Sequence, residues 1–278
     1  MPGLSDTSPD IERVRTECYR RMPTWRKLAL LDDANRTLRA LHAAGFRSRH
    51  PAAPPTAVWA DWLNKSLGPA LAAKVLEVVP MSHLPAEAVR VTAEVMSALK
   101  GLGVRCALGG SFASTVHGDP RSTQDADVMA EPFPGREESL ASVLGPVYYL
   151  NTDTVREANR RRSGFNIIHT TTGFKVDVFI QKVRSFDASV LDRRSPHPFT
   201  PEPSDTLDVV SPEDSILLKL EWFRIGGEIS DRQWGDIQGV MRTQADRLDL
   251  AYLHKWADEI GVGDLLAKAL AEAGLMPF

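Results

Sequence analysis

The stretch ALGGSFASTVHGDPRSTQDADVMAEP, residues 107–132, decides the fold of this 278-residue chain. It begins inside the apolar run 104–108, which predicts a short buried strand. The turn residues Gly109-Gly110-Ser111 follow, and the apolar segment that ends at His117 predicts a short helix. Residues 125–129, with the sequence DADVM, predict a second strand. The expected order is therefore strand, glycine turn, helix and strand.

The remaining sequence adds a hairpin and two helical ends. Residues 164–180 predict a β-hairpin whose strands, 165–170 and 174–180, enclose a turn at 171–173. Ser211-Pro212 predicts a helix start, because Ser is a good N-cap and Pro suits the first helical position. We therefore predict an α/β (α+β) fold, in which a core with a short mixed β-sheet is flanked by N-terminal and C-terminal helical regions.

This pattern divides the chain into three regions. We expect an N-terminal helical region at 1–80, the core at 81–195 and a C-terminal helical region at 206–278. The segment 195–205 holds four prolines, which predicts a linker between the sheet and the C-terminal helices.

The composition excludes several classes of protein. A net charge of −3 gives no large positive field, so a nucleic-acid partner would need a local basic patch. Cys18 and Cys106 lie far apart without metal-binding spacing, which argues against a disulfide framework and a structural zinc site. No apolar run approaches the roughly 20 residues of a membrane helix, and no secretory signal is present. We expect a cytoplasmic protein with no membrane partner.

Three carboxylates are the candidate chemistry. Asp125 and Asp127 are two residues apart on a predicted strand, so their side chains share one face. Asp177 lies in the otherwise apolar strand FKVDVFI, where a carboxylate is costly unless a cation meets it. Carboxylate oxygens suit Mg²⁺, and two such ions about 3.5–4 Å apart can drive nucleotidyl transfer.

The glycine turn is the candidate phosphate site. Gly109 and Gly110 allow close approach of backbone to a phosphate, and the following helix start offers N–H groups and a favourable dipole. Ser111 adds a hydroxyl donor. Arg121 lies before the acids, where it either faces phosphate or anchors the turn by pairing with an acid.

The stretch 107–132 resembles the signature of the polymerase-β nucleotidyltransferase superfamily, and is closest to the bacterial branch with AbiEii-like and MenT-like toxins. The residues at the places of that pattern are Gly109, Gly110, Gly118, Arg121, Thr123, Asp125 and Asp127. The likeness continues through FKVDVFI, SPEDSILLKLEWFR and SDRQWGDI, and so covers about residues 85–240. The branch often has a Lys-Asp pair before its last Asp, where this chain has Gln233 and Trp234.

The resemblance implies a role for each matching residue. Gly110 and Ser111 would hold the triphosphate, and Asp125 and Asp127 would ligate Mg²⁺. Asp177 would bind the second of two ions or accept the proton of the attacking hydroxyl. In the later motifs, Lys219 would reach the phosphates and Asp236 would orient the nucleotide.

The expected enzyme moves a nucleoside monophosphate from a nucleoside triphosphate to an acceptor. The resemblance implies a tRNA 3′ end or a protein hydroxyl as acceptor, and a toxin that could have an antitoxin partner. An aminoglycoside-type small molecule is the alternative acceptor. A nucleotide-binding module without catalysis and an interaction protein working through its N-terminal helices are the competing hypotheses.

The sequence allows two interpretations each for a basic cluster and for Lys219, and it indicates structural roles for two histidines. The basic residues Arg156, Arg160, Arg161 and Arg162 form either a solvated helix end or an RNA-contacting edge. Lys219 is either a phosphate ligand or a surface lysine that extends from its helix to solvent. His117 and His169 have no second ligand at metal-binding spacing, so we expect structural roles for both.

Overall fold

A computed structural model of the protein describes residues 9–78 and 88–275. Its centre is a seven-stranded mixed sheet in the order β3-β4-β5-β2-β1-β7-β6. The strands are β1 (Cys106–Leu108), β2 (Asp125–Ala130), β3 (Tyr148–Tyr149), β4 (Gly164–His169), β5 (Phe174–Ile180), β6 (Ser195–Pro198) and β7 (Thr206–Val209). The pairs β2–β5 and β1–β7 are parallel, and the other neighbours are antiparallel.

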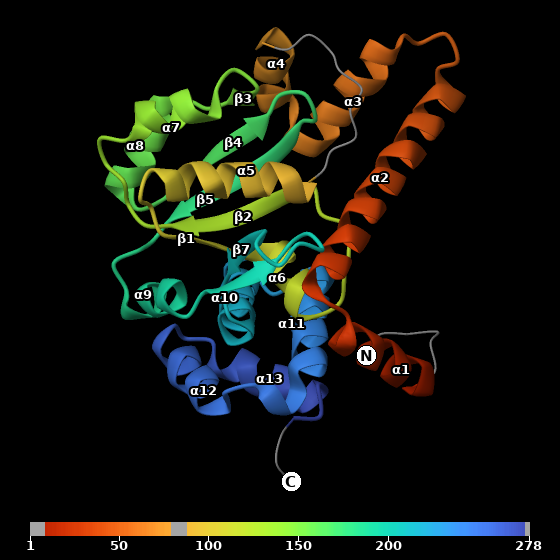
Figure 1. Ribbon diagram of the computed structural model, residues 1–278. Coiled ribbons are helices and arrows are strands. Elements are labelled where there is room, and N and C mark those ends of the chain that lie inside the picture. The colour runs from red at the N-terminus through yellow and green to blue at the C-terminus, as the bar shows by residue number, and fades with distance from the viewer. Residues whose placement is uncertain (1–8, 79–87, 276–278) are drawn as a thin grey trace.

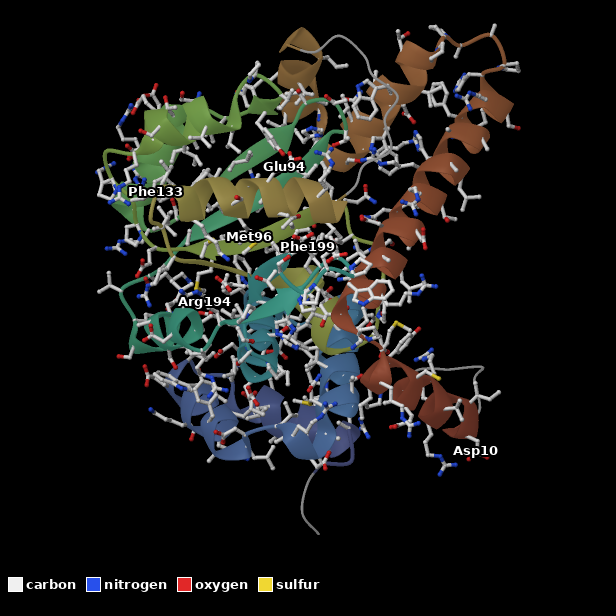
Figure 2. The ribbon with its side chains drawn as sticks, in the orientation of Figure 1. Asp10, Glu94, Met96, Phe133, Arg194 and Phe199 are labelled. Carbon is white, nitrogen blue, oxygen red and sulfur yellow. The ribbon has the colours of Figure 1, made fainter. Side chains whose placement is uncertain are left out.

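Two central strands show why the sheet has one apolar and one polar face. Along β2 the residues Ala126, Val128 and Ala130 are fully buried, and the intervening residues are half-buried. The same alternation runs along β5, where Val176 and Val178 are fully buried. Helix α5 (Ala88–Gly101) lies across the sheet (Figure 1), and its Met96 is almost completely buried in the crowded interior (Figure 2).

The N-terminal helices hold the core from one side. They are α1 (Pro9–Arg21), α2 (Thr24–Arg49), α3 (Pro55–Leu67) and α4 (Pro69–Val78). Lys27 of α2 is buried, and its ammonium donates to the carbonyls of Val116 and Gly118 at 3.0 and 3.3 Å. This lysine satisfies carbonyls at the end of helix α6 (Gly110–His117), so α2 fixes the helix that follows the glycine turn.

The remaining helices complete the fold. Between the strands lie α7 (Glu137–Leu144), α8 (Thr152–Arg161) and α9 (Ser185–Asp192). After the sheet come α10 (Pro212–Ile225), α11 (Asp231–Gln244), the 3₁₀ turn η1 (Ala245–Arg247), α12 (Leu250–Glu259) and α13 (Gly263–Glu272). These C-terminal helices gather at the end of the molecule opposite α3 and α4 (Figure 1). The Ser211 hydroxyl accepts from the Asp214 N–H at 3.1 Å, so the predicted cap of α10 is confirmed.

The predicted α/β class with a short mixed sheet and helical ends is confirmed. The predicted linker at 195–205 is wrong in part, because residues 195–198 form strand β6 at the sheet edge. Edge strands tolerate proline, since its missing N–H faces away from the neighbouring strand. The boundary expected at residues 80 and 81 lies outside the described residues, and the division into regions stays a prediction. No helix of the described chain has the length and apolar character to cross a membrane.

Candidate active site

The three candidate carboxylates lie on one face of two neighbouring strands. Strands β2 and β5 run parallel, and their register sets Asp127 directly beside Asp177. Asp125 precedes Asp127 by two residues, so all three side chains point away from the buried alanines and valines of the same strands. The Thr123 hydroxyl donates to the carboxylate of Asp125 at 3.1 Å, which orients it.

The Asp127 carboxylate has no direct partner for its negative charge. Its side chain makes no hydrogen bond or ion pair with any residue that the structure describes. Burial, followed by the charges of Asp125 and Asp177, raises the pKa of Asp127 from its usual value near 3.8 to about 6. A carboxylate held in this way is a site where a cation would bind favourably.

Asp177, in contrast, has two protein partners. The Lys175 ammonium lies 2.5 Å from one of its oxygens, and the Asn166 amide on β4 donates to the other. Lys175 also lies 3.6 Å from Asp125. Burial alone would lower the pKa of Lys175, but its hydrogen bond to Asp177 and the nearby carboxylates outweigh burial and raise that pKa.

The glycine turn brings the start of α6 against Asp127. The Gly109 N–H donates to the Asp127 carbonyl at 2.8 Å, which ties the turn to β2. Gly110 has a φ of +53°, and a Cβ added there would lie 1.8 Å from the Asp127 carboxylate. Only glycine fits, because any side chain would meet both the left-handed backbone and this carboxylate.

Asp236 holds two basic side chains of the site, those of Arg121 and Lys219, in place. Its carboxylate accepts two hydrogen bonds from Arg121, both at 2.6 Å, and one from Lys219 at 2.8 Å. Arg121 also donates to the Ser111 hydroxyl at 2.6 Å. Burial alone would raise the pKa of Asp236, but Arg121 and Lys219 outweigh it and lower that pKa. Of the two readings of Arg121, the structure has the pairing with an acid.

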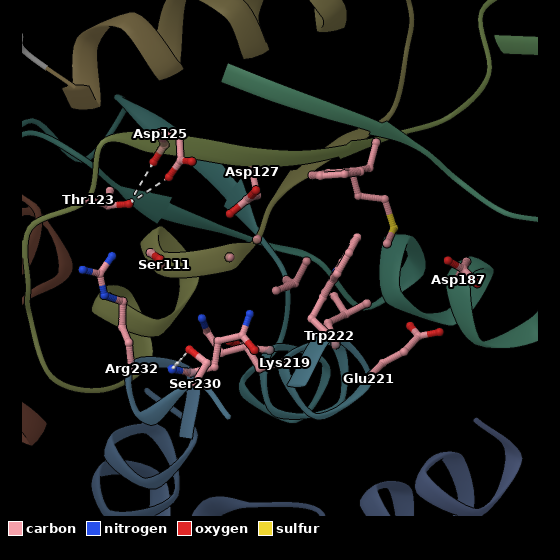
Figure 3. A pocket seen from close by; sticks show the side chains of 18 of the residues that line it. Ser111, Thr123, Asp125, Asp127, Asp187, Lys219, Glu221, Trp222, Ser230 and Arg232 are labelled. Carbon is pink, nitrogen blue, oxygen red and sulfur yellow. Dashed lines mark hydrogen bonds between the residues drawn. The ribbon is translucent and has the colours of Figure 1, made fainter. Parts of the chain in front are cut away.

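These groups open into one pocket of about 500 Å³. Its lining includes Gly109, Gly110, Ser111, Arg121, Asp125, Asp127 and Lys219. Figure 3 shows Asp125 and Asp127 opposite Ser111 and Lys219, with Asp187 and Glu221 beyond Trp222 at the other end. Asp177 and Asp236 do not line the pocket; Asp236 is joined to it through Arg121 and Lys219, which do.

The sequence analysis missed two residues that line the pocket, Arg232 and Trp222, and one that lies beside its carboxylates, Lys175. Arg232 lines the pocket, is exposed, and has no ion-pair partner among residues 9–78 and 88–275. The Trp222 ring is 47% exposed and lies 5.8 Å, centroid to centroid, from the ring of Phe179. Lys175 shares the strand pattern that identified Asp177, so alternation along β5 was the signal that could have found it.

The basic patch near the hairpin is largely neutralised. Arg156 pairs with Asp153 and Glu138, and Arg160 and Arg161 both pair with Glu157. Its acids leave little net positive charge on this helix end. His117 and His169 are buried; the ring of His117 contacts the Val210 carbonyl and that of His169 contacts the Thr172 hydroxyl, in keeping with structural roles.

The donor set suits a hard divalent cation. Asp125 and Asp127 offer carboxylate oxygens to the pocket, and Asp127 lacks a counter-charge. In the part of the chain that the structure describes, no three His, Cys, Asp or Glu residues are grouped to hold one ion. A carboxylate pair completed by phosphate oxygens and water is therefore the arrangement that these residues fit, as is common for Mg²⁺.

No known protein family and no curated protein matches the sequence. Among solved structures, the chain is similar to ANT(2'')-Ia in complex with adenylyl-2''-tobramycin, with 12% identity, 62% of this chain and 97% of that chain covered, and a TM-score of 0.42. For the solution structure of the antibiotic-resistance factor ANT(2'')-Ia the values are 11%, 66%, 93% and 0.39. For an antigenic nucleotidyltransferase-like protein from Paracoccidioides brasiliensis they are 17%, 69%, 95% and 0.36.

Proposed function

We propose that the protein is a divalent-metal-dependent nucleotidyltransferase that moves a nucleoside monophosphate from a triphosphate to an acceptor hydroxyl. The observation that carries the proposal is that Asp125 and Asp127 line the same pocket as the glycine turn 109–110. The carboxylate of Asp127 has no hydrogen-bond or ion-pair partner among the described residues. Residues suited to a cation and residues suited to phosphates line one pocket, and the transfer requires both.

Separate protein groups would bind the phosphates and the metal ion of the proposed complex. The backbone of Gly110 and the helix start behind it face phosphate oxygens, and Lys219 and Arg232 supply positive charge from α10 and α11. Asp236 holds Arg121 and Lys219 in place and does not touch the substrate. When bound at Asp125 and Asp127, Mg²⁺ would neutralise charge on the reacting phosphates.

The proposed transfer balances as a simple displacement. The acceptor oxygen attacks the α-phosphorus, and the bond from that phosphorus to the bridging oxygen of the β-phosphate breaks, releasing pyrophosphate. We assign the acceptor proton to the carboxylate of Asp177, which Lys175 and Asn166 orient. Asp177 lies beside Asp127 in the sheet register, and its own side chain is not among those that line the pocket.

Trp222 is the proposed stacking surface for the nucleobase. It is half exposed, lies on the pocket wall and is backed by Phe179. A flat aromatic ring accepts any base, because every base has a π-face. The residues proposed to hold the triphosphate lie at the end of the pocket that contains Ser111 and Lys219. The base would therefore extend toward Trp222 (Figure 3).

We base the acceptor on the sequence resemblance. We propose a tRNA 3′ end or a protein hydroxyl, with a toxin role and an antitoxin partner, and we keep a small aminoglycoside-type molecule as the alternative. The paired arginines of α8 give no support to an RNA-binding edge at that position.

The test is transfer of label from each α-phosphate-labelled triphosphate. Purified protein and Mg²⁺ are incubated with total tRNA, with an aminoglycoside, or with no added acceptor so that the protein can label itself. The Asp125→Ala/Asp127→Ala variant is the control. We expect label on one acceptor class only, and none with the variant. Label that survives the double substitution would place the chemistry elsewhere. Metal-dependent thermal stabilisation by a triphosphate without transfer would favour the binding module, and no response to any triphosphate would favour the interaction protein.

A further inference from the structure

A positive charge already stands between two of the three carboxylates. The Lys175 ammonium lies 2.5 Å from Asp177 and 3.6 Å from Asp125. Register explains this position, because Lys175 pairs with Asp125 across the parallel strands and precedes Asp177 by two residues on the same face. Its side chain is 21% exposed and does not line the pocket, so the ammonium lies against the two carboxylates and does not extend freely into solvent.

The two members of the register pair Asp127 and Asp177 are therefore in opposite situations. Both oxygens of Asp177 have protein partners, Lys175 and Asn166, and its side chain does not line the pocket. The side chain of Asp127 lines the pocket and has no partner among the described residues. Of these three carboxylates, those of Asp125 and Asp127 line the pocket, where a cation from solvent can reach them, and that of Asp177 does not.

Charge neutralisation indicates a single divalent ion. Three carboxylates and one ammonium leave two formal negative charges, which a single divalent ion neutralises. A second divalent ion between Asp125 and Asp177 would have to enter the position of the ammonium, against its positive charge. The phosphates bring their own negative charge, but Lys219, Arg232 and the start of α6 face them from the other side.

We propose that Lys175 takes the place of the second divalent ion, so that the site binds one ion at Asp125 and Asp127 together with the triphosphate. This replaces the two ions expected from the sequence and rests on the proposed function. Lys175 is then a positioning residue, which holds Asp177 and fills a cation position with a charge that the chain carries itself.

The test counts bound Mn²⁺ by electron paramagnetic resonance. Mn²⁺ is titrated into the full chain mixed with an equimolar non-hydrolysable α,β-methylene triphosphate. We expect one tightly bound ion per chain for the wild type and two for Lys175→Met, which opens the cation position. Lys175→Arg keeps the charge and should still bind one. Lys65→Met, on α3 and paired only with Asp61, removes a lysine outside the pocket and should also bind one.

Two tight ions in the wild type would overturn the inference, and so would a single ion in a folded Lys175→Met protein. Thermal melting by circular dichroism shows whether that variant folds; if it does not, the wild-type count and the Lys175→Arg count still decide. The proposed function fails separately. No tight ion in the wild type, or one that persists in Asp125→Ala/Asp127→Ala, would sink the site itself, whereas label transfer by an enzyme with two ions would sink only the role of Lys175.

Discussion

Asp236→Asn directly tests the ion pairs that Asp236 forms with Arg121 and Lys219. The wild-type carboxylate takes three hydrogen bonds of 2.6–2.8 Å from Arg121 and Lys219, and its side chain is 6% exposed. Removing one partner of a buried ion pair costs about 3–5 kcal/mol, because the other charge is left uncompensated. The Arg121 side chain is 25% exposed and asparagine keeps one acceptor, so we expect the lower end, about 3 kcal/mol.

The assay is urea unfolding at pH 7, followed by tryptophan fluorescence and by circular dichroism. Asp246→Asn is the matched control, since Asp246 is exposed and has no partner among the described residues, and we expect it to change stability by less than about 0.5 kcal/mol. If Asp236→Asn falls within the range of this control, Asp236 is not the anchor of Arg121 and Lys219.

The same pair of proteins gives a pH test with a definite sign. The pKa of Asp236 is lowered on folding, so its contribution is complete above the unfolded value of about 4 and is lost as pH falls through the lower folded value. We expect the stability gap between wild type and Asp236→Asn to stay constant from pH 7 to pH 5 and to narrow below about pH 4. A gap that widens in acid would contradict the assignment of its cause.

Three further predictions follow from the pocket. Gly110→Ala should destabilise the protein by about 1–2 kcal/mol through its left-handed backbone and should abolish metal-dependent stabilisation by a triphosphate, whereas Gly101→Ala, where an added Cβ meets nothing within 4 Å, should do neither in the same melting assay. In metal-free buffer at pH 8, Asp127→Asn should be more stable than wild type by about 2 kcal/mol, because a carboxyl with a raised pKa opposes folding increasingly above its unfolded value of about 4 and fully above about pH 6. Urea unfolding near pH 4 should show no gap, and a variant less stable than wild type at pH 8 would refute the argument. Trp222→Ala should weaken triphosphate binding about tenfold or more for all bases in equilibrium dialysis, and an unchanged affinity would remove Trp222 from the base site.

Local sequence rules predicted the parts of the fold and site that depend on local geometry. Alternation placed Asp125 and Asp127 on one face, and the N-cap rule placed the start of α10 at Ser211. Alternation also applies to Lys175 and Asp177, so the lysine beside the third carboxylate was within reach of the same rule. What a strand presents to each face is a local property.

Long-range pairing was beyond such rules. The register that sets Asp127 beside Asp177 depends on two strands meeting in parallel with other elements between them in sequence. The contact of Arg121 with Asp236 joins residues 115 positions apart, and no local pattern fixes which acid an arginine meets. Strand β6 was missed for a different reason, because its prolines argue against a strand except at a sheet edge, and edge position is itself a tertiary property.

Asp236 and Asp127 show how neighbouring charges distinguish an acid that stabilises the fold from one that is a candidate cation ligand. Asp236 meets two cations, and its pKa is lowered. Asp127 meets mainly other carboxylates, and its pKa is raised to about 6. The first arrangement stabilises the fold without a ligand, whereas the second opposes folding until a cation arrives. An unfavourable charge is retained on a rigid strand beside a glycine turn, and binding of a cation there would relieve it, which is why we propose Asp127 as the centre of the candidate site.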